Sequence, residues 1–355
     1  MDLVDIFIEV LERNSSDLHL TVGSPPIIRV AGKLVKLDYP PLTHNDTREL
    51  IYSILTQDQR KQVESDWEID FSYSVPGKAR FRVNAYFQRN SLGAAFRLIP
   101  TNIRSVDELM LPAVLHKFAA KPRGFVVITG PTGSGKSTTL AAMIEEINES
   151  REEHIMTVED PIEFLYRHKR SIINQREVGS DTKSFNRALK SVLRQDPDVI
   201  LIGEMRDTET MQAALTAAET GHLVFATLHT QDAPQTIDRI IDVFPPHQQS
   251  QIRVQLAATI MGICTQQLLP TVDGTDRVAV CEVLVPTPAI RNLIREAKTH
   301  QIYSSMQTGL QYGMQTMDSS LAGMVRRGKI TKELAIRKSS NPDELERLIV
   351  GRKIA

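Results

Sequence analysis

The sequence predicts an α/β protein with two domains and a helical C-terminal region, on the strength of three observations. Its 355 residues exceed the roughly 150 residues of a typical single domain. Residues 79–87 alternate between apolar and polar side chains, which is typical of a strand with one buried face. Short apolar runs then alternate with helical segments, as in a parallel sheet covered on both faces: 125–129, 154–158, 199–202 and 223–227.

The composition excludes several classes of protein. Lys and Arg total 42 against 43 Asp and Glu, so the whole chain has no charge bias toward nucleic acid or anionic lipid. A hydrophobic fraction of 41% excludes wholesale disorder, and 2 cysteines cannot build a disulfide framework or a four-cysteine zinc site. The apolar runs are too short to cross a bilayer, and the first residues are acidic, unlike a signal peptide. We expect a soluble protein of a reducing compartment.

The order of the predicted elements suggests domain limits. The first domain, 1–100, begins with an amphipathic helix at 2–12 and continues with strands at 17–22 and 27–30, a helix at 43–63, and strands at 79–87 and 94–99. A polar stretch opens a linker or hinge at 101–120. The apolar runs place the core of the second domain at 121–285. The helical region, 286–355, contains apolar stripes at 289–298, 301–307, 317–327 and 332–337.

A phosphate-binding loop is the strongest functional signal. Residues 130–138 match G-x-x-x-x-G-K-[ST], with an apolar strand before them and an amphipathic helix after them. Glycines let backbone N–H groups surround phosphate oxygens at a helix N-terminus, where the helix dipole adds positive potential. We expect Lys136 to reach the β- and γ-phosphates and the Ser137 hydroxyl to hold Mg²⁺. The predicted ATP-binding residues are Thr132, Gly133, Ser134, Gly135, Lys136, Ser137 and Thr138.

Acidic residues follow two of the apolar runs. The run 199–202 ends in Gly203 and Glu204, the Walker B pattern with Glu where Asp is commoner. The run 154–158 is followed by Glu159, Asp160 and Glu163. Because ligands bind at the carboxyl edge of such sheets, Glu163 is the candidate general base, and Glu163 and Glu204 are candidate Mg²⁺ ligands, directly or through water. A solvated acidic loop is the alternative interpretation of 159–163.

Histidines flank the fourth apolar run. His229, just past its carboxyl end, is placed to sense the γ-phosphate, and His222, just before it, is a candidate for orienting neighbouring groups. Zinc binding is not expected because no cysteine stands at ligand spacing. Two histidines taken alone are more often structural than functional.

Arginines of the first domain form a local basic excess. No acid occurs between Asp70 and Asp107, although six cations do: Lys78, Arg80, Arg82, Arg89, Arg97 and Arg104. Arg82 and Arg97 lie on predicted strands, opposite apolar faces, which predicts that they are held rigidly. Rigid guanidinium groups suit a transition-state phosphate, and they would act on the bound nucleotide or on that of a neighbouring subunit. A solvated basic strand face is the alternative.

Four segments together resemble a known family. Residues 130–138, 157–164, 203–207 and 220–230 look like the Walker A, Asp, Walker B and His boxes of the secretion-superfamily ATPases, in that order. These are hexameric motors of type II and type IV secretion and of type IV pili. Within the family, residues 16–20, 289–296 and 313–318 look like those of pilus-retraction members.

The resemblance implies a specific architecture and activity. It implies a PAS-like N-terminal domain, a RecA-like ATPase domain and a homohexamer that hydrolyses Mg·ATP. It also implies Glu163 as base, Glu204 as Walker B acid, and phosphate contacts from Arg82 and Arg97. Retraction is favoured over pilus assembly because assembly-type relatives usually carry a longer N-terminal region and a tetracysteine zinc insertion. An accessory paralogue of the retraction motor shares the boxes and remains an alternative.

The expected cellular role follows from the same resemblance. A ring of this kind would lie in the cytoplasm at the pilus base and move an inner-membrane platform protein, with membrane contact only through its partners. Rotation of the first domain about the linker would drive it, transmitted by helix 289–296. This helix could equally be packed only against the core. A RecA-like DNA motor and a nucleotide-dependent binding switch are the rival functions, and we expect no nucleic-acid partner because the net charge is near neutral.

Overall fold

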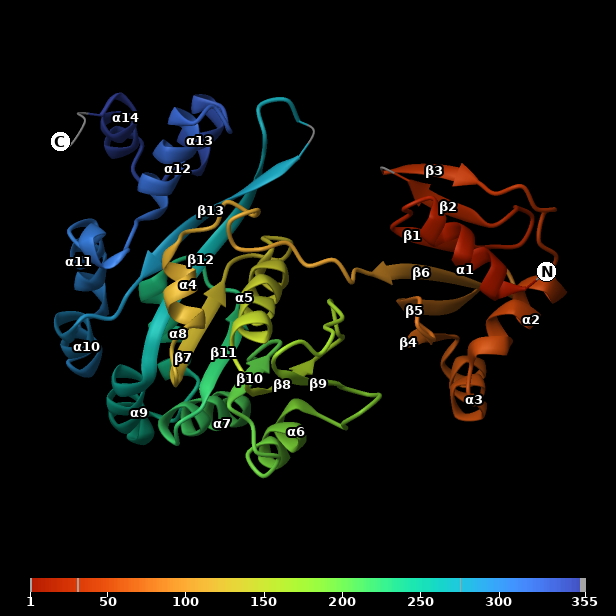
Figure 1. Ribbon diagram of the computed structural model, residues 1–355, viewed down its shortest axis with the longest axis horizontal. Coiled ribbons are helices and arrows are strands. Elements are labelled where there is room, and N and C mark those ends of the chain that lie inside the picture. The colour runs from red at the N-terminus through yellow and green to blue at the C-terminus, as the bar shows by residue number, and fades with distance from the viewer. Residues whose placement is uncertain (1, 31, 275, 352–355) are drawn as a thin grey trace. The chain divides into compact units, whose positions relative to one another are not determined.

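The computed structural model describes residues 2–30, 32–274 and 276–351, and it confirms the predicted α/β class. The chain forms two compact units, each with its own sheet (Figure 1). The first unit comprises Met1–Thr101 together with Glu163–Leu165, and the second comprises Asn102–Ile162 and Tyr166–Ala355.

The first unit is a six-stranded antiparallel sheet with helices on one face. Its strand order is β3-β2-β1-β6-β5-β4. Phe7 on the first helix stacks on Phe81 with ring centroids 4.4 Å apart, and Phe96 packs edge-on to both. These aromatic rings pack between the first helix and one face of the sheet. The other face of the sheet is mostly polar. The elements are α1 (Leu3–Glu12), β1 (Asp17–Leu20), β2 (Ile27–Val30), β3 (Lys33–Lys36), α2 (His44–Ile54), α3 (Gln57–Asp66), β4 (Glu68–Val75), β5 (Ala79–Gln88) and β6 (Ser91–Ile99).

Two features of this unit differ from the sequence prediction. The helix predicted at 43–63 is two helices, because Leu55 is extended and Thr56 is the N-cap of α3. Thr56 forms a capping box with Gln59, which satisfies free N–H groups of a new helix and ends the old one. Strand β4 was not predicted, and it pairs with β5 along its whole length.

The second unit is built on a seven-stranded sheet in the order β13-β12-β7-β11-β10-β8-β9. Its central strands are parallel, as predicted, and alternate residues face opposite layers of the core. Phe125 and Val127 belong to the core cluster that includes buried residues of α6 to α11, whereas Val126 and Ile128 belong to the cluster that includes those of α4 and α5. The strands are β7 (Gly124–Thr129), β8 (His154–Glu159), β9 (Ile172–Glu177), β10 (Val199–Ile202), β11 (Leu223–Leu228), β12 (Ile260–Pro270) and β13 (Arg277–Leu284).

Helices cover both faces of this sheet and continue beyond it. They are α4 (Val114–Ala119), α5 (Lys136–Ser150), α6 (Phe185–Val192), α7 (Thr208–Glu219), α8 (Ala233–Asp242), α9 (Pro246–Thr259), α10 (Pro288–Arg295), α11 (Ile302–Gln307), α12 (Met317–Arg326), α13 (Lys332–Lys338) and α14 (Pro342–Val350). The last three form a small core of their own with β12 and β13. In the described part of the chain, no helix combines the length and apolar character that a membrane span needs.

The sequence did not predict β9, the β12–β13 pair or α14. Strand β12 begins at the residue after α9 ends, without a Gly or Pro signal between them, and β13 is the antiparallel edge of an otherwise parallel sheet. Residues 352–355 of the predicted helical region lie outside the described residues.

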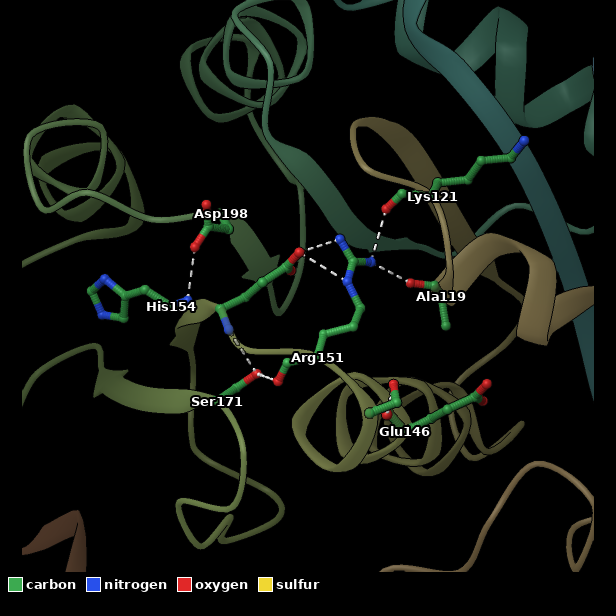
Figure 2. A network of polar contacts seen from close by, with 9 residues as sticks. Ala119, Lys121, Glu146, Arg151, His154, Ser171 and Asp198 are labelled. Carbon is green, nitrogen blue, oxygen red and sulfur yellow. Dashed lines mark hydrogen bonds and ion pairs between the residues drawn. The ribbon is translucent and has the colours of Figure 1, made fainter.

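A polar network joins three elements at the amino end of β8 (Figure 2). Arg151, which follows α5, donates from Nη1 to the carbonyls of Ala119 and Lys121 at 2.7 and 2.9 Å, and pairs with Glu153. Ser171 Oγ donates to the Arg151 carbonyl at 2.7 Å. Arg151 thus satisfies carbonyls at the end of α4, where cations are favoured, and fixes α4 against α5 and β8.

Glu282 on β13 joins two helix starts. Its carboxylate accepts the backbone N–H of Ala233, the first residue of α8, at 2.8 Å, and that of Met317, the first residue of α12. Burial raises the pKa of Glu282 to about 7, and the nearby carboxylates of Asp232 and Asp318 act in the same direction. The raised pKa means that folding favours the protonated form of this residue.

Replacement of Glu282 should therefore change how stability depends on pH. Below the unfolded pKa of 4.5, the raised pKa does not lower the free energy of unfolding. As pH rises from 4.5 through about 7, the folded protein loses stability relative to the unfolded chain. We expect Glu282→Gln to be more stable than the parent at about pH 8, by at most about 3 kcal/mol, with a smaller difference at about pH 5. Denaturant unfolding at both pH values measures this, with the exposed Glu12→Gln as control. An equal loss of stability at both pH values would contradict the assignment.

Candidate nucleotide-binding site

The predicted site residues follow four parallel strands that are neighbours in the sheet. The phosphate-binding loop follows β7, His229 follows β11, Glu204 follows β10 and Asp160 follows β8. The strands pair in the order β7-β11-β10-β8, with Thr129 opposite Leu228 and Ile202 opposite both Ala226 and Val158. Their carboxyl ends therefore meet at one edge, where α/β sheets bind ligands.

The phosphate-binding loop encloses the ammonium group of Lys136. Lys136 Nζ donates to the carbonyls of Gly130 and Pro131 at 2.9 and 3.1 Å, and the side chain is buried. Gly135 has a φ of 89° and directly precedes α5, so the N–H groups of the first turn of α5 lie at the end of the loop. A positive charge inside the loop and a helix N-terminus beside it are the two features that bind a phosphate chain.

Gln266 on β12 holds this loop in place. Its side-chain Nε2 donates to the Ser134 carbonyl at 2.6 Å, and its Oε1 accepts from the Thr139 hydroxyl at 2.9 Å. A Cβ on Gly130 would lie 2.2 Å from the Gln266 carbonyl, so only glycine fits at the start of the loop. Gln266 is 1% exposed, and so its bonds are shielded from water.

A cavity of about 180 Å³ opens beside the loop. Gly135 and Thr138 form its side next to the phosphate-binding loop, and Leu268 and Arg277 on β12 and β13 form another. The segment before α4 contributes Arg104, Glu108, Leu109, Met110 and Leu111. The cavity therefore combines apolar walls with cationic side chains next to the loop.

Glu204 and His229 lie together at the sheet edge. Glu204 Oε1 is 3.2 Å from His229 Nε2, and Oε2 accepts from Arg206 at 2.7 Å. The hydrogen bond from Arg206, with its charge and that of His229, lowers the pKa of Glu204 despite partial burial. Glu204 is therefore ionised at neutral pH, as a metal-binding or water-polarising acid requires.

Threonine hydroxyls connect the His229 segment to the strand that carries the loop. Thr129 Oγ1, at the end of β7, donates to the Thr230 carbonyl at 2.8 Å. Thr230 Oγ1 lies 2.7 Å from the hydroxyls of both Thr129 and Thr236. These hydrogen bonds therefore join the residue after His229 to the strand that carries the loop.

Comparisons with known proteins show which family the chain belongs to. Residues 3–337 match the family described as type II/IV secretion system protein. The chain belongs to this family. It is 50% identical over 97% of its length, and 99% of the relative's, to the type IV pilus retraction ATPase PilT of Pseudomonas aeruginosa. It is also 43% identical to the type IV pilus ATPase PilU of the same organism, over 96% of this chain and 89% of PilU.

A solved structure extends the match to three dimensions. A crystal structure of the pilus retraction motor PilT with bound ADP aligns with a TM-score of 0.90 and 49% identity, covering 98% of this chain and 99% of that one. The predicted fold class, an N-terminal α/β domain followed by a RecA-like ATPase domain, is confirmed. So is the prediction that the chain is a P-loop ATPase related to PilT.

His222 does not join the other predicted residues of this secretion ATPase. It precedes β11, at the opposite edge of the sheet, and its carbonyl accepts from Gly124 N at 2.9 Å. At ~3.3 Å per residue, seven residues of strand put it roughly 23 Å from His229. Its ring Nδ1 lies 2.9 Å from the Ala217 carbonyl near the end of α7, so within this chain it holds the α7–β11 turn.

Glu163 belongs to a segment that clusters with the first unit. Residues Glu163–Leu165 group with Met1–Thr101, and Leu165 N donates to the Pro100 carbonyl at 3.3 Å. Glu159, in contrast, is buried at the end of β8 and accepts from Thr157 and Gln175 at 2.6 and 3.3 Å. Glu159 therefore supports the sheet, whereas the role of Glu163 as base stays a prediction.

Arg82 and Arg97 are directly opposite each other on β5 and β6. Both are exposed, so packing does not immobilise them as the alternating pattern predicts. Arg97 is instead held by an ion pair in which its Nε donates to Asp17 Oδ1 at 3.0 Å.

Helix α10 is tied to α9 by Arg291. Ile290 and Ile294 are buried, as its apolar stripe indicates. Arg291 donates to the carbonyls of Ala257, Ala258 and Ile260 at the end of α9. Arg291 therefore joins α10 to the end of α9.

Five residues at the site are not singled out by the sequence: Gln266, Arg206, Thr129, Thr230 and Thr236. Gln266 lies on an unpredicted strand, so nothing placed it near the loop. Arg206 is two residues after Glu204. This spacing is the signal that could have identified it as the ion-pair partner of Glu204. Threonines 129, 230 and 236 come together only through strand pairing.

Loss of the Gln266 contacts should weaken nucleotide binding. Gln266→Leu removes two buried hydrogen bonds, one to the loop and one to the first turn of α5, worth roughly 1 kcal/mol each, so we expect about a tenfold or larger rise in the Kd for ATP. Thr139→Val removes only one of them and should have a smaller effect. Titration calorimetry measures both, with thermal unfolding as the check on folding. Equal ATP affinity in Gln266→Leu and parent would contradict this role.

Proposed function

We propose that this chain is the subunit of a homohexameric motor that hydrolyses Mg·ATP and powers retraction of a type IV pilus. The observation that carries the proposal is the meeting of the phosphate-binding loop, Glu204 and His229 at one sheet edge. Identity of 50% to a pilus retraction ATPase over nearly the whole chain supports the cellular role.

The residues available for hydrolysis have distinct roles. The cavity beside Gly135 accepts the nucleoside. The phosphate chain is bound by the residues of the loop: Thr132, Gly133, Ser134, Gly135, Lys136, Ser137 and Thr138. Glu163 removes a proton from the attacking water. Arg82 and Arg97 neutralise charge that develops on the γ-phosphate, and His229, held by Glu204, responds to its presence.

The donor set fits Mg²⁺. Ser137 lies in the first turn of α5, and Glu204 is an ionised carboxylate at the carboxyl end of β10. Hydroxyl and carboxylate oxygens are ligands that Mg²⁺ prefers, and Glu163 would add a third oxygen donor, directly or through water. When bound, Mg²⁺ would neutralise charge on the phosphates and help to orient them.

Motion in the proposed ring arises from the two-unit architecture. Phosphate release would allow the first unit to rotate about the linker near residues 100–110. A ring at the cytoplasmic face of the inner membrane would pass that rotation to a pilus platform protein. Membrane contact then occurs only through partners.

Two substitutions should separate binding from chemistry. We expect Glu163→Gln to bind ATP with parent affinity but to lose turnover by a factor of about 10² or more, because no base remains. Lys136→Ala should lose both affinity and turnover. Phosphate release and nucleotide binding are measured in parallel, with and without DNA. Parent turnover in Glu163→Gln would show that Glu163 is not the base. Strong stimulation of ATP hydrolysis by DNA would support a DNA motor instead.

Deletion of the gene in its source organism tests the cellular role. Loss of a retraction motor should leave abundant pili but abolish surface movement, whereas loss of an assembly motor should remove the pili. Electron microscopy and a surface-motility assay give the two readouts, and the parent gene supplied in trans is the control. Normal movement after deletion would point to an accessory role.

A further inference from the structure

One row of side chains crosses the polar face of the first sheet. The strand register pairs Asp17 with both Arg29 and Arg97, Arg97 with Arg82, and Arg82 with Ser72. Directly paired residues project from the same face. The row, called the charged row here, therefore runs Arg29, Asp17, Arg97, Arg82, Ser72 over β2, β1, β6, β5 and β4.

Asp17 is the carboxylate of the charged row. Its Oδ1 accepts from Arg97 Nε at 3.0 Å, and its Oδ2 accepts from Ser16 Oγ at 2.7 Å. Arg29 Nε lies 3.8 Å from Oδ2. The side chain is 12% exposed, and although its burial opposes ionisation, the bonds from Ser16 and Arg97 lower the pKa of Asp17. Asp17 is thus a fixed anion, more deeply placed than the arginine it holds.

The ion pair sets the orientation of Arg97. A guanidinium group is planar and carries five N–H donors, of which one is on Nε. Asp17 takes the Nε donor, which restricts the orientation of the guanidinium group, while the terminal nitrogens belong to a side chain that is 74% exposed. A fork of this kind matches the geometry of phosphate oxygens.

Arg82 lies on the other side of Arg97 and has a different environment. Its neighbours in the charged row are Arg97 and Ser72, neither of which is an anion. Directly opposed like charges are unfavourable across paired strands, so an anion that contacts both guanidinium groups relieves repulsion. Asp17 neutralises one side of Arg97 and leaves the side toward Arg82 electropositive.

We infer that Asp17 is a positioning residue that orients Arg97 for the γ-phosphate of the nucleotide. The inference rests on the proposed function, in which Arg97 contacts that phosphate. It assigns different behaviour to the two arginines: Arg97 is preorganised by Asp17, whereas Arg82 is ordered by the anion itself. Preorganised charge acts in the transition state without a cost of reorientation, so Asp17 should influence kcat more than ATP affinity.

The test compares Asp17→Asn with the parent in the full-length chain. An amide keeps the shape of the side chain but removes the charge that holds Nε. We expect kcat to fall about tenfold while the KM for ATP changes less than about twofold. Asp70→Asn, the same substitution on the same sheet but off the charged row, is the matched control and should retain parent turnover. Thermal unfolding reports whether each variant folds.

A double-mutant cycle shows whether Asp17 acts through Arg97. Arg97→Ala should lose turnover, and adding Asp17→Asn to it should cause no further loss. A further loss in the double variant, or parent kcat in Asp17→Asn, overturns the positioning role while leaving Arg97 in place. Parent turnover in Arg97→Ala instead removes the arginine role that the proposed function assigns.

Arg97→Lys is the second variant should Asp17→Asn not fold. Lysine keeps the charge and can still pair with Asp17, but it lacks the fixed fork. We expect a loss of kcat close to that of Arg97→Ala. Parent kcat in Arg97→Lys would show that charge alone suffices and would overturn the inference.

Discussion

The parallel pairing of β7, β11, β10 and β8 is the constraint on which the site depends. Parallel strands that pair in register must end at the same edge, so each residue that follows a strand is delivered to one place. Four parts of the site are far apart in sequence but follow adjacent strands: the phosphate-binding loop with Lys136, then His229, Glu204 and Asp160. The same rule places His222, which precedes β11, at the opposite edge.

Side-chain hydrogen bonds connect the turns at the carboxyl edge of this sheet. Gln266 joins the loop to β12, Thr129 joins β7 to the His229 segment, and Thr227 joins β11 to the Gly203 carbonyl before Glu204. A buried hydrogen bond adds only about 1 kcal/mol, but leaving its partner unsatisfied costs more. The main effect of such contacts is therefore to select one conformation of the site. Their contribution to the free energy of folding is small.

How much the sequence could predict depended on the range of the interactions. The motif around Lys136 and the acid after Val199–Ile202 were found because strand, turn and helix are contiguous there. The split at Leu55 was missed because α3 buries a single apolar residue, Val63, so no apolar period marks the start of a second helix, and the cap at Thr56 decides the boundary locally. The roles of Gln266 and Asp17 depend on strand order, which the hydrophobic pattern of a single strand does not contain.

The β12–β13 pair gives the ATPase core a direct connection to its C-terminal helices. Gln266, which holds the loop, is paired with Cys281 on β13, and the Cys281 carbonyl accepts from Gln315. The next residue, Glu282, holds the starts of both α8 and α12. Gln266 at the loop and Glu282 at the starts of α8 and α12 therefore lie on the same pair of hydrogen-bonded strands. The β12–β13 pair, although absent from the predicted sheet, therefore connects the phosphate-binding loop to the C-terminal helices.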